Sequence, residues 1–211
     1  MDYIRNPSEI EEKSFEIIEN NLGEKCFPGL RFEIIKRVIH TTADFDYYDM
    51  LQFKDGVDEK IMDMIKKGAT IITDTSMVKS GINKRNLELL GCKVNCFVDS
   101  YEAKRISEVK GITRSIAAID VAANLEGSKI FVIGNAPTAI YRIVELYDSG
   151  ILRPEAVVAV PVGFVGAAEA KDLIYSKDIP CIITRGRKGG STIAAAIINA
   201  IMKEALKNFG G

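Results

Sequence analysis

Any imidazole acid–base chemistry within one chain must use His40, because the sequence contains a single histidine. Arg37 lies three residues earlier and shares the same face of a helix predicted over residues 30–40. Ser14 interrupts the apolar stripe of an earlier predicted helix, as a buried polar side chain that needs a partner does. His40 is therefore a candidate acid, with Arg37 and Ser14 as candidate binding residues. A histidine at a helix C-terminus is also favoured by the helix dipole alone, so a structural role stays open.

The residues after the histidine offer further polar groups. Thr41 and Thr42 carry hydroxyls that we expect to hold the imidazole ring and to contact a ligand. Asp44, Asp46 and Asp49 follow and are candidates for paired acids. Aspartates in a loop more often cap helices and form turns, so both interpretations stay open for them.

Loops that follow predicted strands form a second group of candidates. The loop 185–192 contains three cations and three glycines directly before a long apolar helix. Glycine lets a ligand approach the backbone, and arginine and lysine supply charge and hydrogen-bond donors. Free N–H groups at a helix N-terminus also favour anions. We therefore predict that Arg187, Lys188, Gly190 and Ser191 bind an anionic ligand. Strand-to-helix turns also use glycine for structural reasons, and cations in a surface loop are often simply solvated, so a structural role stays open.

Two more loops of this kind, 134–138 and 161–166, contain glycine and lead into predicted helices. Neither they nor the loop 185–192 has the glycine spacing of a Walker A loop or of a dinucleotide-binding fingerprint. Asn135 lies in the first of these loops, and Arg114 begins a predicted helix. Both are further candidates for contact with the same anionic ligand.

The fold class follows from short apolar runs that alternate with helical patterns from residue 70 onward. This alternation predicts an α/β fold with a doubly wound, mostly parallel sheet flanked by helices. The predicted strands are 70–73, 93–98, 129–133, 156–160 and 181–184, and the predicted helices around them are 82–90, 101–109, 114–124, 138–147, 166–176 and 191–208. Ligands of such sheets bind beyond the carboxyl ends of the strands, which is where the loops described above lie.

The N-terminal part of the chain has a different pattern. Asn6-Pro7-Ser8-Glu9 is a helix-start signal, and further helices are predicted over 30–40 and 58–67. We expect residues 1–64 to form a helical extension that carries His40, and residues 65–211 to form the sheet-containing core of the same single domain. The extension has 8 basic and 15 acidic residues, net −7, and the remainder is net +6. Such a field can steer an anionic ligand to the second part, but the same asymmetry also arises by chance on a protein surface, so both interpretations stay open.

Composition excludes several classes of partner. The 28 basic and 29 acidic residues nearly cancel, which argues against nucleic-acid binding. The first residues lack a signal-peptide pattern, and the longest uncharged run, 189–202, is too short to cross a membrane. Four scattered cysteines and one histidine do not form a metal-binding pattern, and they suggest reduced thiols. We expect a cytoplasmic protein without a metal site.

Six segments, in order along nearly the whole chain, resemble motifs of the precorrin-8X methylmutase family. They are RVIHTTADFD at 37–46, TDTSMV at 73–78, TRS at 113–115, GNAPTA at 134–139, PVGFV at 161–165 and TRGRKGGS at 184–191. Several ordered motifs are far more specific than any one glycine-rich loop. The resemblance implies an isomerase of cobalamin biosynthesis.

The resemblance also implies a reaction and its participants. A methyl group moves from C11 to C12 of precorrin-8X or cobalt-precorrin-8, which gives hydrogenobyrinic or cobyrinic acid. The family uses no cofactor, its corrinoid substrate has several carboxylates, and it forms a homodimer with the ligand near the subunit interface. His40 aligns with the catalytic histidine of the family, and Ser14 and Arg37 align with substrate-contact positions.

A rearrangement of this kind needs a proton donor rather than a redox group, and one positioned imidazolium beside a ring nitrogen supplies it. A non-catalytic corrinoid-binding or carrier protein, with His40 as a contact or an axial metal ligand, stays an alternative. A nucleotide-dependent regulator is a third. Whether the substrate carries cobalt stays open.

Overall fold

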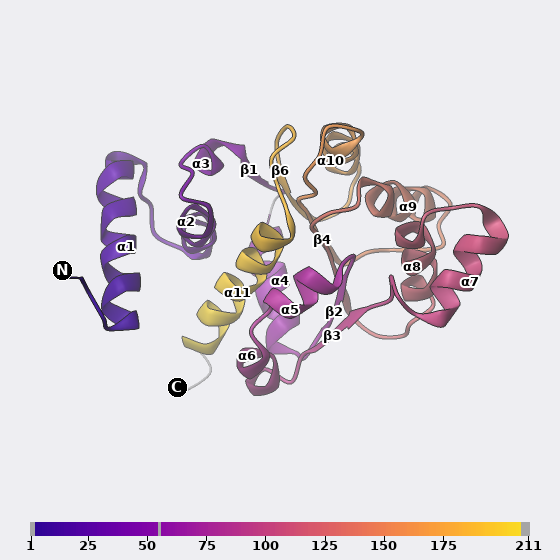
Figure 1. Ribbon diagram of the computed structural model, residues 1–211, viewed down its shortest axis with the longest axis horizontal. Coiled ribbons are helices and arrows are strands. Elements are labelled where there is room, and N and C mark those ends of the chain that lie inside the picture. Colours follow the sequence, from indigo (N-terminus) through magenta and orange to yellow (C-terminus); the bar gives the residue numbers. More distant parts are fainter. Residues whose placement is uncertain (1–2, 55, 208–211) are drawn as a thin grey trace.

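The computed structural model describes residues 3–54 and 56–207 and contains a six-stranded sheet with helices on both faces (Figure 1). The strand order is β1-β6-β5-β4-β2-β3, and all neighbours pair in parallel except β1 and β6. The strands are β1 (Leu51–Phe53), β2 (Thr70–Thr73), β3 (Lys93–Cys96), β4 (Lys129–Ile133), β5 (Ala156–Ala159) and β6 (Cys181–Thr184). The predicted α/β class with a mostly parallel sheet is confirmed.

The helices form two groups about this sheet. They are α1 (Pro7–Leu22), α2 (Leu30–Thr42), α3 (Tyr47–Met50), α4 (Val57–Lys66), α5 (Ser76–Gly81), α6 (Lys84–Leu89), α7 (Tyr101–Lys110), α8 (Arg114–Ala123), α9 (Pro137–Asp148), α10 (Ala167–Ser176) and α11 (Ser191–Lys207), with a 3-10 turn at Gly23–Lys25. Alternate strand residues face opposite cores: Ile71 and Ile130 pack with α2, α4 and α11, whereas Ile72 and Phe131 pack with α9 and α10. This double burial explains the continuous apolar runs of the strands.

The helices that carry His40 and Ser14 lie at one side of the molecule. Helix α11 packs on the sheet side of α2, and α1 packs against α2 on the side away from the sheet (Figure 1). Helix α1 starts as its sequence predicts, because the Asn6 side chain accepts a hydrogen bond from the Ser8 N–H at 3.0 Å and Pro7 opens the first turn. His40 of α2 therefore lies near both the preceding helix α1 and the last described helix, α11, which is about 150 residues away in the sequence.

Several element boundaries differ from the predictions. The helix predicted over 82–90 is α6, which begins at Lys84 because the Asn83 side chain accepts from the Asn86 N–H to cap it, and the preceding helix α5 was not predicted. The strands predicted to end at 98 and 160 end at Cys96 and Ala159. Asn208, the predicted end of the last helix, lies outside the described residues.

Strand β1 and helix α3 were not predicted. Leu51–Phe53 lies in the segment expected to be helical, yet it pairs antiparallel with β6, with Leu51 opposite Thr184. A three-residue strand is too short to show a period, and its pairing depends on a partner 130 residues away. Within the described residues, no helix is both long and apolar enough to span a membrane.

Candidate functional site

His40 is held by a side chain from the neighbouring helix. The Ser14 Oγ on α1 lies 2.7 Å from the His40 Nδ1 on α2, which is a hydrogen bond whose direction depends on the tautomer. Phe15, the next residue of α1, packs edge-on against the imidazole with ring centroids 5.2 Å apart. The prediction that Ser14 is a polar residue in need of a partner is confirmed, and that partner is His40. The Nδ1 contact leaves Nε2 as the ring nitrogen available to a ligand.

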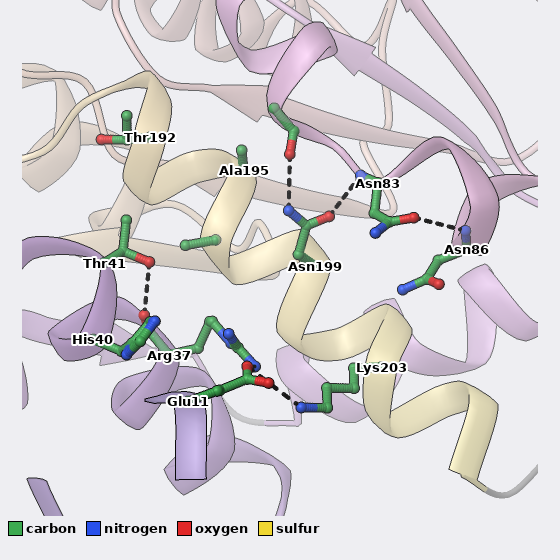
Figure 2. Close-up of a pocket in the computed structure, with 12 residues that line it drawn as sticks. Glu11, Arg37, His40, Thr41, Asn83, Asn86, Thr192, Ala195, Asn199 and Lys203 are labelled. Atoms are coloured by element: carbon green, nitrogen blue, oxygen red, sulfur yellow. Dashed lines mark hydrogen bonds and ion pairs between the residues drawn. The ribbon is translucent and has the colours of Figure 1, made fainter. Parts of the chain in front are cut away.

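Two cations and one carboxylate lie beside the histidine (Figure 2). The Arg37 Nη2 is 2.5 Å from the Glu11 Oε1, and the Lys203 Nζ of α11 is 3.6 Å from the same oxygen. The Arg37 guanidinium also lies over the Phe15 ring, 4.8 Å from its centroid. Residues i, i+3 and i+4 of α1 (Glu11, Ser14 and Phe15) thus face Arg37 and His40 of α2.

These residues line a polar cavity of about 710 Å³ between α2, α11 and the α5–α6 turn (Figure 2). Its lining is formed by Glu11, Arg37, His40, Thr41, Gly81, Asn83, Asn86, Thr192, Ala195, Ala196, Asn199 and Lys203. Asn199 ties two walls together, because its amide donates to the Gly81 carbonyl and accepts from the Asn83 N–H, both at 2.8 Å. The cavity is a place for an anionic, hydrogen-bonding part of a ligand.

An apolar groove of about 330 Å³ lies at another side of His40. It runs between α1 and the end of α2 and is lined by Ile4, Ile10, Lys13, Ser14, Ile17, Ile18, Ile39, His40, Ala43 and Phe45. Lys13, Ser14 and His40 are the polar residues of this lining. The imidazole therefore borders both a charged cavity and an apolar groove.

The surroundings of His40 favour its neutral form in the free chain. Burial of the ring lowers its pKa below the ordinary value of 6.5, and the Arg37 guanidinium and the Lys203 ammonium lower it further. The Glu11 carboxylate acts in the opposite direction. Burial raises the pKa of Glu11 itself, but the hydrogen bond and charge of Arg37, helped by Lys203, outweigh burial and leave this pKa below its ordinary value.

The threonines after the histidine do not hold its ring as expected. The Thr41 Oγ1 donates to the Arg37 carbonyl at 2.8 Å, and the Thr42 Oγ1 donates to the Val38 carbonyl at 2.9 Å. Both bonds reach the carbonyl four residues back, which is the ordinary arrangement for threonine in a helix. Thr41 still lines the polar cavity, but the ring is positioned by Ser14 on another helix.

The backbone N–H groups of the loop that contains Asn135 bind a carboxylate of the protein itself. The carboxylate of Asp74, at the end of β2, accepts from the N–H groups of Gly134 at 2.9 Å, Asn135 at 2.8 Å and Ala136 at 2.7 Å. Asp74 is almost fully buried, and burial raises its pKa while these three donors oppose the rise. These N–H groups are therefore not free for a ligand, because a carboxylate 60 residues away uses them, and contact of the Asn135 side chain with a ligand stays a prediction.

The loops after β5 and β6 are also bound to each other. The fully buried Lys171 donates to the carbonyls of Pro161 at 3.1 Å and Lys188 at 2.9 Å and to the Thr184 hydroxyl at 3.2 Å, and burial lowers its pKa to about 8. The Gly190 N–H donates to the Val160 carbonyl at 2.8 Å. The Gly190 N–H therefore already has a partner in the free chain, and its contact with an anionic ligand stays a prediction.

The remaining predicted residues lie outside the cavity around His40. Lys188 pairs with Asp44 at 2.6 Å and with Asp46 at 2.9 Å, and these two hydrogen bonds raise its pKa. The exposed Arg187 lies over the Phe164 ring at 5.9 Å. The Ser191 hydroxyl lies 3.1 Å from that of Thr75, and Arg114 pairs with Asp99 at 3.3 Å. Asp44 and Asp46 thus act as partners of a lysine.

Other residues of the cavity were missed from the sequence, although α11 contains a signal for them. Thr192, Asn199 and Lys203 line the cavity from positions i, i+7 and i+11 of α11, which form one polar stripe on an otherwise apolar helix. Glu11 shares the Ser14 face of α1. Within residues 3–54 and 56–207, no group of three or more histidine, cysteine or acidic side chains is placed to hold a metal ion.

Comparison with known proteins identifies the family. The precorrin-8X methylmutase family model matches residues 9–204. The chain is 46% identical to a cobalt-precorrin-8 methylmutase of Salmonella typhimurium over 209 residues, which cover 96% of this chain and 97% of that protein. It is 36% identical to a precorrin-8X methylmutase of Pseudomonas aeruginosa, over 97% of this chain and 99% of that one.

A solved structure agrees with this result. The crystal structure of precorrin-8X methylmutase from Thermus thermophilus superimposes with a TM-score of 0.85 at 36% sequence identity, and the match covers 94% of this chain and 98% of that one. Sequence and fold thus match over nearly the full length of both proteins. The chain belongs to the precorrin-8X methylmutase family.

Proposed function

We propose that this chain moves a methyl group from C11 to C12 of a precorrin-8 macrocycle, with His40 as the proton donor. The observation that supports this role best is the position of His40, which Ser14 holds between an apolar groove and a cationic cavity. A corrinoid has an apolar ring and a rim of carboxylates, so its two surfaces fit these two environments. The products are hydrogenobyrinic acid, or cobyrinic acid when the ring holds cobalt.

The reaction requires the protein only to donate a proton and to take one back. Substrate and product are isomers, so one molecule rearranges and any proton delivered to the macrocycle must be regained within the turnover. The imidazolium form of His40 can donate that proton, and the resulting imidazole can accept one back. Burial and the cations beside it favour neutral His40 in the free chain, whereas substrate carboxylates favour the imidazolium. Binding of the substrate thus favours the protonated form of His40, which is the form that acts as the acid.

The proposed substrate is the cobalt form. The relative from Salmonella typhimurium, at 46% identity, is named for cobalt-precorrin-8, and a Leptospira interrogans relative at 40% identity has the same name. A paired assay with metal-free and cobalt-loaded substrate tests this choice. A higher kcat/KM for the metal-free ring would contradict it.

The proposed partner is a second copy of the chain, in the cytoplasm. The net −7 of residues 1–64 and the net +6 of the remainder favour contact between unlike parts of two copies, and two-fold dimers are the commonest soluble assemblies. Light scattering at working concentration measures the assembly directly. A monomer at all salt concentrations would rule the dimer out.

An absorbance assay separates catalysis from carriage. Methyl migration to C12 extends the conjugation of the ring and changes its spectrum, whereas a carrier releases its ligand unchanged. We expect the purified chain to convert substrate in amounts that exceed its own concentration many times. Binding without a spectral change after release would support the corrinoid carrier instead.

The pH dependence tests the proton donor. Activity that needs imidazolium falls as pH rises through the His40 pKa. The kcat/KM profile reports the free protein, so its fall should lie below the ordinary histidine pKa of 6.5. The kcat profile reports the complex, in which substrate carboxylates favour the charged ring, so its fall should lie at higher pH. Since the chain has one histidine, its NMR signals give both pKa values directly. Coincident profiles unrelated to the NMR titration would exclude His40 as the acid.

A further inference from the structure

Glu11 holds an unusual position among the residues of the polar cavity. Of the described residues that line this cavity, it is the one acidic side chain, and it lies between Arg37 of α2 and Lys203 of α11 (Figure 2). Its Oε1 is 2.5 Å from the Arg37 Nη2 and 3.6 Å from the Lys203 Nζ. The carboxylate thus joins two cations that come from separate helices.

The charges of this cluster do not balance. Two cations face one carboxylate, the neighbouring imidazole adds a third positive charge when protonated, and the amides of Asn83 and Asn86 line the same cavity. Arg37 and Lys203 also share the Phe15 ring, at 4.8 and 5.8 Å from its centroid. The charged side chains of the cavity therefore carry a net positive charge, which favours the binding of an additional anion.

A second cluster of the same helices shows the opposite balance. The buried Lys36 of α2 is bonded to both Glu19 and Glu33, at 2.7 and 2.8 Å. This single cation has two carboxylates, so no charge is left for a ligand. The contrast marks the Glu11 cluster as the one of the two that has cationic charge to offer.

Glu11 is also placed so that a ligand can displace its carboxylate from Arg37 and Lys203. About a third of its side chain is exposed at the cavity, and the Lys203 contact is longer than a hydrogen bond. A ligand carboxylate that takes this place regains the same two cationic partners, so exchanging one carboxylate for another costs little. A carboxylate that enters the cavity meets the same donors that Glu11 now uses.

We propose that the Glu11 carboxylate occupies, in the free chain, the place that a carboxylate of the ligand takes between Arg37 and Lys203. This inference rests on the proposed function only in its choice of a corrinoid as the ligand. Glu11 keeps two like charges together beside His40 until the ligand replaces it. The site then selects ligands that present a carboxylate at this position, because an amide or ester cannot replace the charge of Glu11.

The exchange also concerns the histidine. The charged groups that face His40 are Glu11 from α1, Arg37 from its own helix and Lys203 from α11, while Ser14 and Phe15 are uncharged. Lys13 lines the apolar groove near the ring and is paired with Glu16 at 2.8 Å. Of these groups, only Glu11 is an anion whose charge favours the imidazolium. A ligand carboxylate that replaces it preserves the negative charge that proton donation needs.

The test removes the charge of Glu11 while keeping its shape. With cobyrinic acid as the probe, Glu11→Gln should bind roughly two- to fivefold more tightly than the parent chain, because the ligand no longer competes with an internal carboxylate. The NMR titration of His40 in the free variant should show a lower pKa than in the parent. Glu12→Gln removes the same charge from the next residue of α1, outside the cavity, and should change neither value.

The possible results lead to different conclusions. Equal or weaker binding of cobyrinic acid by Glu11→Gln, with parent binding intact, would overturn the exchange and leave the proposed function standing. If the parent chain does not bind cobyrinic acid, the proposed function fails, and citrate, a small tricarboxylate, decides the exchange. Tighter citrate binding by Glu11→Gln, seen as a larger shift of the His40 signals, would support the exchange. No gain for citrate would overturn it.

Discussion

The helices around His40 and the loops at the strand ends both offer groups that can bind anions, but the helices present charged side chains to the polar cavity, whereas several loop N–H groups are already bonded. At the helices, Arg37 and Lys203 reach the cavity with side chains. At the strand ends, the N–H groups of residues 134–136 are bonded to Asp74, and the Gly190 N–H is bonded to Val160. A glycine-rich loop is therefore no proof of a ligand site, because the protein can supply the partner itself.

The two regions differ because of where their donors come from. Backbone N–H groups in a buried turn must find acceptors during folding, since leaving them without one costs free energy. Side chains on a partly exposed helix face remain available to a ligand, since water and a nearby carboxylate accept their hydrogen bonds in the free chain. The strand-end loops thus stabilise the fold, and the helix face keeps charge for binding. Four substitutions test this division, beginning with the largest expected effect.

His40→Asn should lower turnover by about 10²–10⁴-fold, because asparagine keeps a hydrogen-bond donor near the ring but cannot deliver a proton. Affinity for cobyrinic acid, measured by absorbance titration, should survive better, since many carboxylate contacts share the binding. The parent rate with an unchanged pH profile would return His40 to a structural role at the end of α2.

Asp74→Asn should lower the free energy of unfolding by roughly 2–3 kcal/mol. The amide NH2 of asparagine replaces one carboxylate oxygen, so a hydrogen-bond donor then faces the backbone N–H groups that this oxygen accepted from. Chemical denaturation measures this loss. The His40 pKa, followed by NMR, should stay at the parent value, since Asp74 does not line the cavity. Asp99→Asn is the matched control, because this exposed carboxylate pairs only with the exposed Arg114 among the described residues, and its loss should leave stability unchanged. Equal effects of the two substitutions would contradict the assigned role of Asp74.

The strands, Ser14 and Asp74 show what the sequence can and cannot predict. The strands 70–73, 129–133 and 181–184 were predicted residue for residue, because apolar runs bounded by turns depend on local pattern. Ser14 was predicted to need a partner, since a polar residue within an apolar stripe is a local signal. The use of the 134–136 N–H groups by Asp74 is a contact between distant segments, so no local pattern reveals it. For the same reason Glu11 and Asn83 were missed. The polar stripe of α11, in contrast, is a local pattern from which Asn199 and Lys203 could have been predicted.

Ser14→Ala should reduce kcat by roughly tenfold or less, which corresponds to one lost hydrogen bond to the imidazole. The side chain positions His40, so the loss should appear in kcat more than in KM. Nitrogen NMR shifts of the ring should show a changed tautomer balance, which a purely structural role would not produce. Ser14→Thr keeps the hydroxyl and should recover most of the rate. A full loss in both variants, with normal NMR shifts, would assign Ser14 to packing alone.

Arg187→Ala should have the smallest effect and decides whether the strand-end loops belong to the binding site at all. Arg187 is exposed, and among the described residues its side chain contacts only the Phe164 ring, whereas the charge of Lys188 is already balanced by Asp44 and Asp46. If the corrinoid rim reaches this loop, Arg187→Ala should weaken cobyrinic acid binding by about threefold at low salt and reduce its salt dependence. Lys188→Met should change the salt dependence less, because its two aspartates compete with the ligand. Affinity of Arg187→Ala equal to the parent at low salt would place the whole loop outside the site and confine ligand binding to the helices around His40.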